Sequence, residues 1–294
     1  MKKLWTVMIG ALALGVLVLL VSCSKDSTST SAGETDQSAL TSMMQDDSDL
    51  EAVDAWGGDD LGGSSPLDSA VTPLNWARAG VRRYVSFNVS FQGDTATITR
   101  TASYNGTFRV LIDTTGGVRT VITKTMHNSL VRKAHARRIA HGRLPRDNWR
   151  IYEVTPEVML SSDTNTVQPA RVQFIYTAGG APVQALNITD PLNTYFSRDS
   201  LPAIPVGAQL TVVVTPTETD TVAAFLHPHA WREGRLHRVA MTPGAENTYS
   251  ATFTVGPRIG VHVTAPDLIS SATLYTSDGV YDAGSWAIPY RTVQ

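Results

Sequence analysis

The sequence predicts an all-β protein, and three observations support that fold class. Apolar and polar residues alternate over residues 85–91, as expected of a strand with one buried face. Short apolar segments recur through the rest of the chain, separated by Gly, Pro, Asn and Asp. Only 17% of the 294 residues are charged, and the sequence has neither a glycine-rich nucleotide-binding motif nor alternating strand and helix patterns.

The sequence pattern of residues 71–162 predicts an antiparallel meander domain, which is curled or barrel-like so that its edges are protected. After the strand over residues 85–91, a turn at 92–94 leads into 95–104, where threonines line one face. Asn105-Gly106 predicts a tight hairpin turn, because both residues tolerate positive φ. Further strands are expected over residues 108–113, 118–126, 130–140 and 149–154.

The sequence pattern of residues 163–294 predicts a second antiparallel domain. Candidate strands occupy residues 170–176, 183–188, 208–216, 220–226, 236–241, 247–255, 258–265 and 271–276. Their number and spacing resemble an immunoglobulin-like β-sandwich at the level of pattern, without the paired cysteines of antibody domains. The resemblance implies two sheets packed face to face.

The N-terminal residues predict export and membrane anchoring. Lys2 and Lys3 precede an apolar run from Leu4 to Val21, which is the pattern of a signal peptide. The run ends in Leu20-Val21-Ser22-Cys23, which resembles the lipobox of bacterial lipoproteins. This resemblance implies cleavage before Cys23, acylation of its thiol and anchoring in a lipid bilayer. An uncleaved transmembrane helix is the alternative for the apolar run.

The chain is therefore expected to consist of a signal peptide at 1–22, a linker at 23–70 and the two β domains. The linker contains many Asp, Ser and Gly residues and is expected to be a disordered tether that starts at the lipidated Cys23. Helical spacing from Leu40 to Trp56, with Ser38 as a possible N-cap, interrupts it. This segment is interpreted as a helix docking on its own body, as a transient feature, or as a partner-binding peptide.

The residue after Cys23 bears on which membrane would receive the lipidated protein. It is Ser24 rather than Asp. By resemblance to enterobacterial sorting, this favours the outer membrane if the organism has two membranes, and otherwise the external face of the cell membrane.

Metal binding has one candidate group. His227 and His229 are two residues apart, so an extended strand would turn both side chains to one side. His237 and a nearby glutamate would complete a tetrahedral set. Pro228 disrupts strand geometry between them, which favours structural or solvent-facing histidines instead. No metal or other cofactor is therefore expected.

Basic residues crowd the region 119–150. On a strand, Lys133 and Arg137 would share one face, and Arg132 and Arg138 the other. A cationic face would suit lipid headgroups or an acidic polysaccharide. Solvation, or pairing with the acidic linker of the same chain, is the alternative, and no nucleic acid partner is expected.

The sequence contains no serine-nucleophile motif, so no catalytic residues are assigned. Tyr281, Trp286 and Tyr290 form a late aromatic cluster, interpreted either as part of a terminal strand that locks the sandwich edge or as an exposed platform for sugar rings. The predicted function is that of a membrane-anchored envelope lipoprotein, a non-enzymatic binding or structural module for an envelope polymer or a protein partner. The alternative is a secreted hydrolase acting on polysaccharide.

Overall fold

A computed structural model describes residues 34–46, 72–114, 118–197, 199–217, 222–228 and 238–294. Every helix and strand of these residues belongs to one compact unit, Asp36–Gln294. Cys23, the predicted signal peptide and most of the predicted linker lie outside the described residues.

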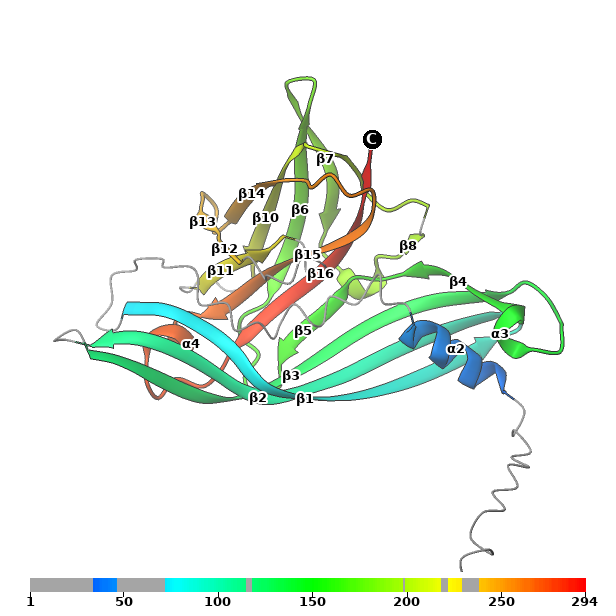
Figure 1. Cartoon of the computed structure of the whole chain (residues 1–294), viewed down its shortest axis with the longest axis horizontal. Helices are drawn as coiled ribbons and strands as arrows, with labels where there is room; N and C mark the ends of the chain where they lie inside the picture. The colour runs from blue at the N-terminus through cyan, green and yellow to red at the C-terminus, as the bar shows by residue number, and fades with distance from the viewer. Residues whose placement is uncertain (1–33, 47–71, 115–117, 198, 218–221, 229–237) are drawn as a thin grey trace, which may run out of the picture. The chain divides into compact units, whose positions relative to one another are not determined.

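The all-β prediction is confirmed, because the strands form two sheets that are antiparallel apart from one short parallel pair (Figure 1). The larger sheet is eleven-stranded and contains β1 (Thr72–Gln92), β2 (Thr95–Thr114), β3 (Val118–Arg138), β4 (Trp149–Val154), β5 (Glu157–Ser161), β8 (Phe196–Ser197), β9 (Ala203–Pro205), β11 (Val222–His227), β12 (Val239–Ala240), β15 (Gly260–Ser270) and β16 (Ala283–Val293). The smaller, five-stranded sheet contains β6 (Pro169–Ala178), β7 (Ala181–Ile188), β10 (Gln209–Pro216), β13 (Thr242–Pro243) and β14 (Tyr249–Thr254).

The helices are short: α2 (Asp36–Gln45), α3 (Pro145–Asn148), α4 (Ser271–Tyr275) and the 3-10 turn η3 (Pro191–Asn193). The larger sheet runs in the order β1-β2-β3-β5-β16-β15-β11-β12 and, among the described strands, stays open with β1 and β12 at its ends. The predicted boundary at residues 162 and 163 falls in the connection from β5 to β6, where the chain passes to the smaller sheet.

Apolar side chains of both sheets meet in the largest core cluster, so the C-terminal half is a sandwich. Phe174 and Val212 of the smaller sheet pack there with Leu226, Leu268 and Trp286 of the larger one. The two predicted β segments nevertheless share a sheet, because β5 pairs with β3 on one side and with β16 on the other.

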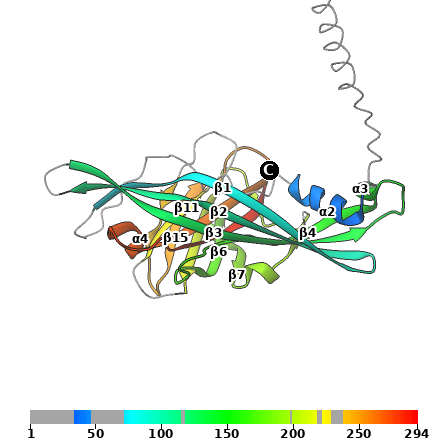
Figure 2. The same ribbon diagram turned by 90° about the horizontal axis from the view of Figure 1, so that it is seen from below.

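The meander of β1, β2 and β3 is longer than the sandwich strands, and Figure 2 shows it extending past them on both sides. Its strands follow the predicted period of two. On β2, Ala96 and Ile98 are buried whereas Thr97 and Thr99 are partly exposed. One face of the meander therefore packs on the core, and the opposite face meets solvent.

The predicted hairpin at Asn105-Gly106 is wrong, because β2 continues through both residues. The neighbouring strand β1 has a register irregularity between Ala79 and Arg82, opposite this point. A Cβ atom on Gly106 would lie 2.7 Å from the carbonyl oxygen of Ala79, so the glycine is needed for close approach of the two backbones. An Asn-Gly pair thus serves a bulge here and not a turn.

The predicted strand over residues 271–276 is also wrong, since the helix α4 occupies this position. The Ser270 side chain accepts a hydrogen bond from the backbone N–H of Thr273, which is the geometry of an N-cap. Lys124 of β3 donates to the carbonyl oxygens of Ala272 and Thr276 at the other end of the helix, at 3.0 and 2.7 Å. Capping at both ends outweighs the strand-like composition of this short segment.

The helix α2 lies within the predicted linker and begins two residues before the expected N-cap Ser38. Leu40 and Met44 are buried in one cluster with Ile98 of β2 and Trp149 of β4. The structure therefore places the described part of this segment on its own body, which is one of the alternatives that the sequence left open, and the rest of the segment, to Trp56, lies outside the described residues.

Candidate functional site

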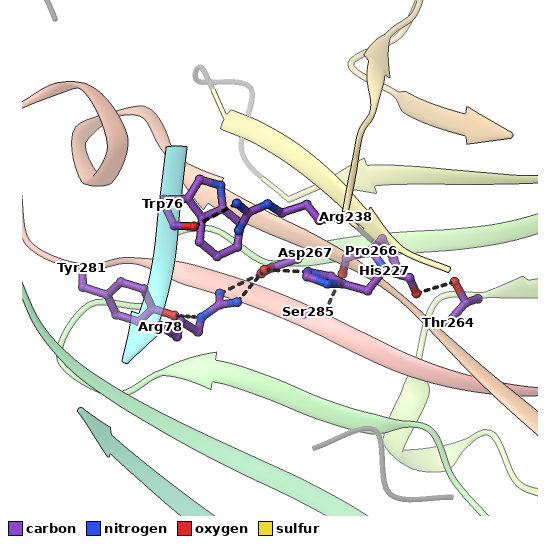
Figure 3. A network of polar contacts seen from close by, with 9 residues as sticks. All are labelled: Trp76, Arg78, His227, Arg238, Thr264, Pro266, Asp267, Tyr281 and Ser285. Carbon is purple, nitrogen blue, oxygen red and sulfur yellow. Dashed lines mark hydrogen bonds and ion pairs between the residues drawn. The ribbon is translucent and has the colours of Figure 1, made fainter. Parts of the chain in front are cut away.

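The metal candidates do not form a described site. His227 ends β11 with its side chain buried, whereas His229 and His237 lie outside the described residues. Within the part of the chain that the structure describes, no group of three His, Cys, Asp or Glu residues is arranged to hold a metal ion. His227 instead belongs to a buried polar network (Figure 3).

An ion pair between Arg78 of β1 and Asp267 of β15 is the centre of that network (Figure 3). The guanidinium donates two hydrogen bonds to the carboxylate, at 2.7 and 3.1 Å, and Arg78 Nε donates to the Tyr281 hydroxyl at 3.0 Å. The Arg78 and Asp267 side chains are only 1% and 0% exposed. Such a pair stabilises the fold only when its hydrogen bonds are this complete, because both charges have lost their water.

His227 and Arg238 extend the network on either side. His227 Nε2 lies 3.4 Å from a carboxylate oxygen of Asp267, a long hydrogen bond. Arg238 stacks its guanidinium 3.8 Å from the ring centroid of Trp76 and donates to the carbonyl oxygen of that residue at 2.8 Å. The network thus joins β1 of the meander to β11 and β15 of the sandwich.

Two hydroxyl groups fix the backbone around this pair (Figure 3). Thr264 donates to the carbonyl oxygen of His227 at 3.0 Å, and Ser285 donates to that of Pro266 at 2.5 Å. These two bonds tie β15 to β11 and to β16 just before Asp267. Because the central side chains are buried, we assign the network a structural role and not one in substrate binding.

The protonation states follow from burial and charge. Burial lowers the pKa of His227 below its usual value, although its hydrogen bond to Asp267 acts in the opposite direction. Burial by itself would raise the pKa of Asp267, but the positive charge of Arg78 and the hydrogen bond from His227 hold it below its usual value. At neutral pH, the network therefore contains a charged Arg78–Asp267 pair and a neutral His227.

The lowered pKa of His227 predicts a loss of stability in mild acid. Below about pH 6.5, the unfolded chain binds a proton at this residue that the folded chain does not, so the free energy of unfolding falls as the pH falls. The slope is at most about 1.4 kcal/mol per pH unit from this group. Urea denaturation of the wild type and of His227→Gln should therefore show a difference that shrinks between about pH 7.5 and pH 5.5. A difference that is constant with pH would contradict this assignment.

The basic residues divide between the two faces of β3, as the alternation predicted. Arg132 is buried and donates from Nε to the carbonyl oxygen of Thr155 at 3.2 Å. Arg138, on the same face, pairs with Asp36 of α2 at 2.5 Å and stacks on Trp149 at 4.6 Å. Arg138 thus pairs with the acidic segment of the same chain and Arg132 is buried, so this face is not available as a cationic surface.

The opposite face of the meander is polar and exposed. We call it the outer face and define it by the residues Ser86, Asn88, Ser90 and Gln92 on β1, Thr95, Thr97, Thr99 and Thr101 on β2, and Lys133, His135 and Arg137 on β3, all of them exposed or partly exposed. The strand register aligns these residues in rows, because Asn88 lies opposite Thr99, and Thr99 lies opposite Lys133. The row of hydroxyl and amide side chains on β1 and β2 therefore lies directly beside a row of basic side chains on β3.

Aromatic rings adjoin this row of basic side chains. His135 stacks on Tyr195 with ring centroids 3.9 Å apart and planes at 11°, and its Nδ1 lies 3.1 Å from a carboxylate oxygen of Glu153. The Arg137 guanidinium lies 5.8 Å from the ring centroid of Tyr152. The sequence patterns identified the cations but not these rings, because both tyrosines come from later parts of the chain.

The late aromatic cluster is not an exposed platform. Tyr281, Trp286 and Tyr290 are all buried, and the last two lie on β16 in the interior of the sheet. The hypothesis that these rings stack on sugars is therefore wrong, and the strand does not lock an edge of the sheet. The rings fill the core.

A scan against protein-family models finds no match to this chain, and a search of curated proteins finds none either. No family is identified. In the described residues, no helix is both long enough and apolar enough to cross a membrane.

Proposed function

We propose that this chain is a membrane-anchored envelope lipoprotein whose β body is a non-enzymatic binding module for an acidic polysaccharide of the cell envelope. The outer face is the observation that supports the proposal. It is a continuous row-by-row array of hydroxyl, amide and basic side chains on three paired strands. The lipobox Leu20-Val21-Ser22-Cys23 supports the anchor, and Ser24 supports delivery to the outer membrane where two membranes exist.

The chemistry of the outer face suits a polysaccharide. Hydroxyl and amide side chains both donate and accept hydrogen bonds, as sugar hydroxyls do. Alternate residues on a strand repeat at about 7 Å, so an extended polymer meets the same groups repeatedly. Lys133 and Arg137 supply charge for carboxylate or phosphate groups, next to the rings of Tyr152 and Tyr195.

The surroundings of the buried carboxylates favour a binding module over the hydrolase alternative. Glycoside hydrolysis requires two carboxyl groups on either side of a bound sugar. The deepest carboxylates, Glu157 and Asp267, are each paired with a buried arginine, Arg100 and Arg78 respectively. Both carboxylates therefore act as counter-ions in the core.

Charge reversal on the outer face tests the binding proposal. The double variant Lys133→Glu/Arg137→Glu should bind polygalacturonate about tenfold more weakly than the wild type, since each exposed ion pair contributes up to about 1 kcal/mol. Arg109→Glu/Arg119→Glu is the matched control, because both arginines are exposed further along the meander. Affinity measured by isothermal titration, with neutral dextran as the second ligand, gives the comparison. Equal affinities of the two double variants would overturn the proposal.

Replacing Cys23 tests the anchor. Cys23→Ala removes the thiol that would carry the lipid, so the variant should lose metabolic labelling by palmitate and accumulate as an unprocessed precursor. Cys23 is the only cysteine of the chain, so no other thiol can replace it. Normal processing and membrane retention of Cys23→Ala would overturn the lipoprotein assignment.

A further inference from the structure

The strand β1 ends the larger sheet, and among the described strands β2 is the only one that pairs with it. Gln92 and Thr95 flank the tight turn at Gly93-Asp94, where Gly93 has a φ of +59°. In such a turn, the flanking residues hydrogen-bond each other, so the even-numbered residues from Tyr84 to Gln92 direct their backbone groups toward β2. The odd-numbered residues from Val85 to Phe91 therefore direct their N–H and C=O groups away from the sheet. We call this side of residues 84–92 the open edge.

In its own sequence and register, the described strand segment 84–92 has none of the charges, prolines or bulges that normally protect an edge strand. Residues 84–92 contain no Lys, Pro or acidic residue, and the register with β2 is regular throughout. Val85 and Phe91 are 39% and 44% exposed, although Phe87 and Val89 between them pack against the cluster beneath α2. A strand that adds to this edge would cover both the backbone groups and the exposed apolar side chains.

The sequence of the open edge is complementary to itself in antiparallel pairing. If two copies pair around Asn88, Val85 lies opposite Phe91 and Phe87 lies opposite Val89, so each large ring meets a smaller side chain. These are odd-numbered residues, whose backbone groups point to the edge. At each end, the tight turn that contains Asp94 of one copy would lie near Arg82 of the other, so opposite charges adjoin there.

We infer that a second copy of this chain binds at the open edge, so that two larger sheets join through antiparallel β1 strands on a two-fold axis at Asn88. The adjoining opposite charges and the Val–Phe pattern favour a second copy over an unrelated extended peptide. Pairing would also bring the outer faces of both copies onto the same side of one continuous sheet. The inference rests on β1 alone and does not depend on the proposed function.

A disulfide at the two-fold axis tests the pairing and its register. In a Cys23→Ser background of the full chain in detergent, Asn88→Cys would face itself across a pair with Cα atoms about 4.5 Å apart, which suits a disulfide. Mild oxidation should therefore convert most of the Asn88→Cys chain to a covalent dimer on non-reducing gels. Ser86→Cys should link at least about tenfold less, since its two copies would be about 14 Å apart along the strands. A mixture of Ser86→Cys and Ser90→Cys should link efficiently, because these positions would be opposite.

A proline in the open edge tests the backbone pairing independently. Val85→Pro removes an N–H that points away from β2, so the ladder with β2 is retained and the chain should keep its circular dichroism spectrum. Light scattering should show a dimer for the Cys23→Ser chain and a monomer for Val85→Pro in the same background. The inference is overturned if the parent chain is monomeric at all concentrations, if folded Asn88→Cys fails to link, or if Ser86→Cys links equally well. A dimer that survives in folded Val85→Pro would overturn it too.

Discussion

Replacing Asp267 with alanine is expected to lower the free energy of unfolding by about 3–5 kcal/mol. The variant leaves the Arg78 guanidinium buried without the carboxylate that now accepts two of its hydrogen bonds. Water does not replace that partner readily, because the Arg78 side chain is only 1% exposed. Urea denaturation at neutral pH, followed by circular dichroism, measures the loss.

An exposed ion pair and a double variant provide the controls for this experiment. Asp163 accepts a hydrogen bond from His127 at the surface, so Asp163→Ala should cost less than about 1 kcal/mol. Arg78→Met/Asp267→Leu removes both charges together and should recover most of the stability that Asp267→Ala loses. A loss below about 1 kcal/mol for Asp267→Ala would show that the pair contributes little to stability.

Phe108→Ala is expected to destabilise the protein by about 3–5 kcal/mol through the cavity that it creates. Phe108 is fully buried, with its ring 5.2 Å from that of Trp76 and 5.1 Å from that of Tyr281. These rings come from β1, β2 and the segment before β16, so the lost contacts join distant parts of the chain. Thermal unfolding by calorimetry gives the size of the effect.

Val121→Ala is the matched control for Phe108→Ala, because Val121 lies on the neighbouring strand β3 and is 53% exposed. Its truncation should change the free energy of unfolding by less than about 0.5 kcal/mol. Similar losses for both variants would contradict the distinction between a packed and a solvent-facing side of the meander.

Local periodicity was sufficient to predict much of this fold. The strand predicted over residues 149–154 coincides with β4, and the predicted threonine-lined face of β2 is exposed as expected. Alternation identifies such segments because a strand with one buried face needs apolar side chains at every second position. The same reasoning placed Lys133 and Arg137 on one face of β3 and Arg132 and Arg138 on the opposite face.

Features that depend on distant contacts could not be predicted in this way. Asn105-Gly106 has the composition of a turn, and only the bulge in β1 explains its place within a strand. The Arg78–Asp267 pair spans 189 residues and carries no local motif. The tyrosines beside His135 and Arg137 reach the outer face through the pairing of β4 with β3 and the fold of the segment before β8. Each of these depends on tertiary structure, about which a short window of sequence says nothing.

The last strand, β16, pairs with β5 from the middle of the chain, and this pairing has a consequence for how the chain folds. Ser161, at the end of β5, hydrogen-bonds Asp282, 121 residues further along, and Arg78 hydrogen-bonds Tyr281 across 203 residues. Contacts of such sequence separation require the closure of long loops before they contribute any stability, so they slow folding. The meander can form from neighbouring hairpins, but its buried face stays uncovered until β15 and β16 arrive. We therefore expect the exposed intermediate, and not the native protein, to be the species most prone to aggregation.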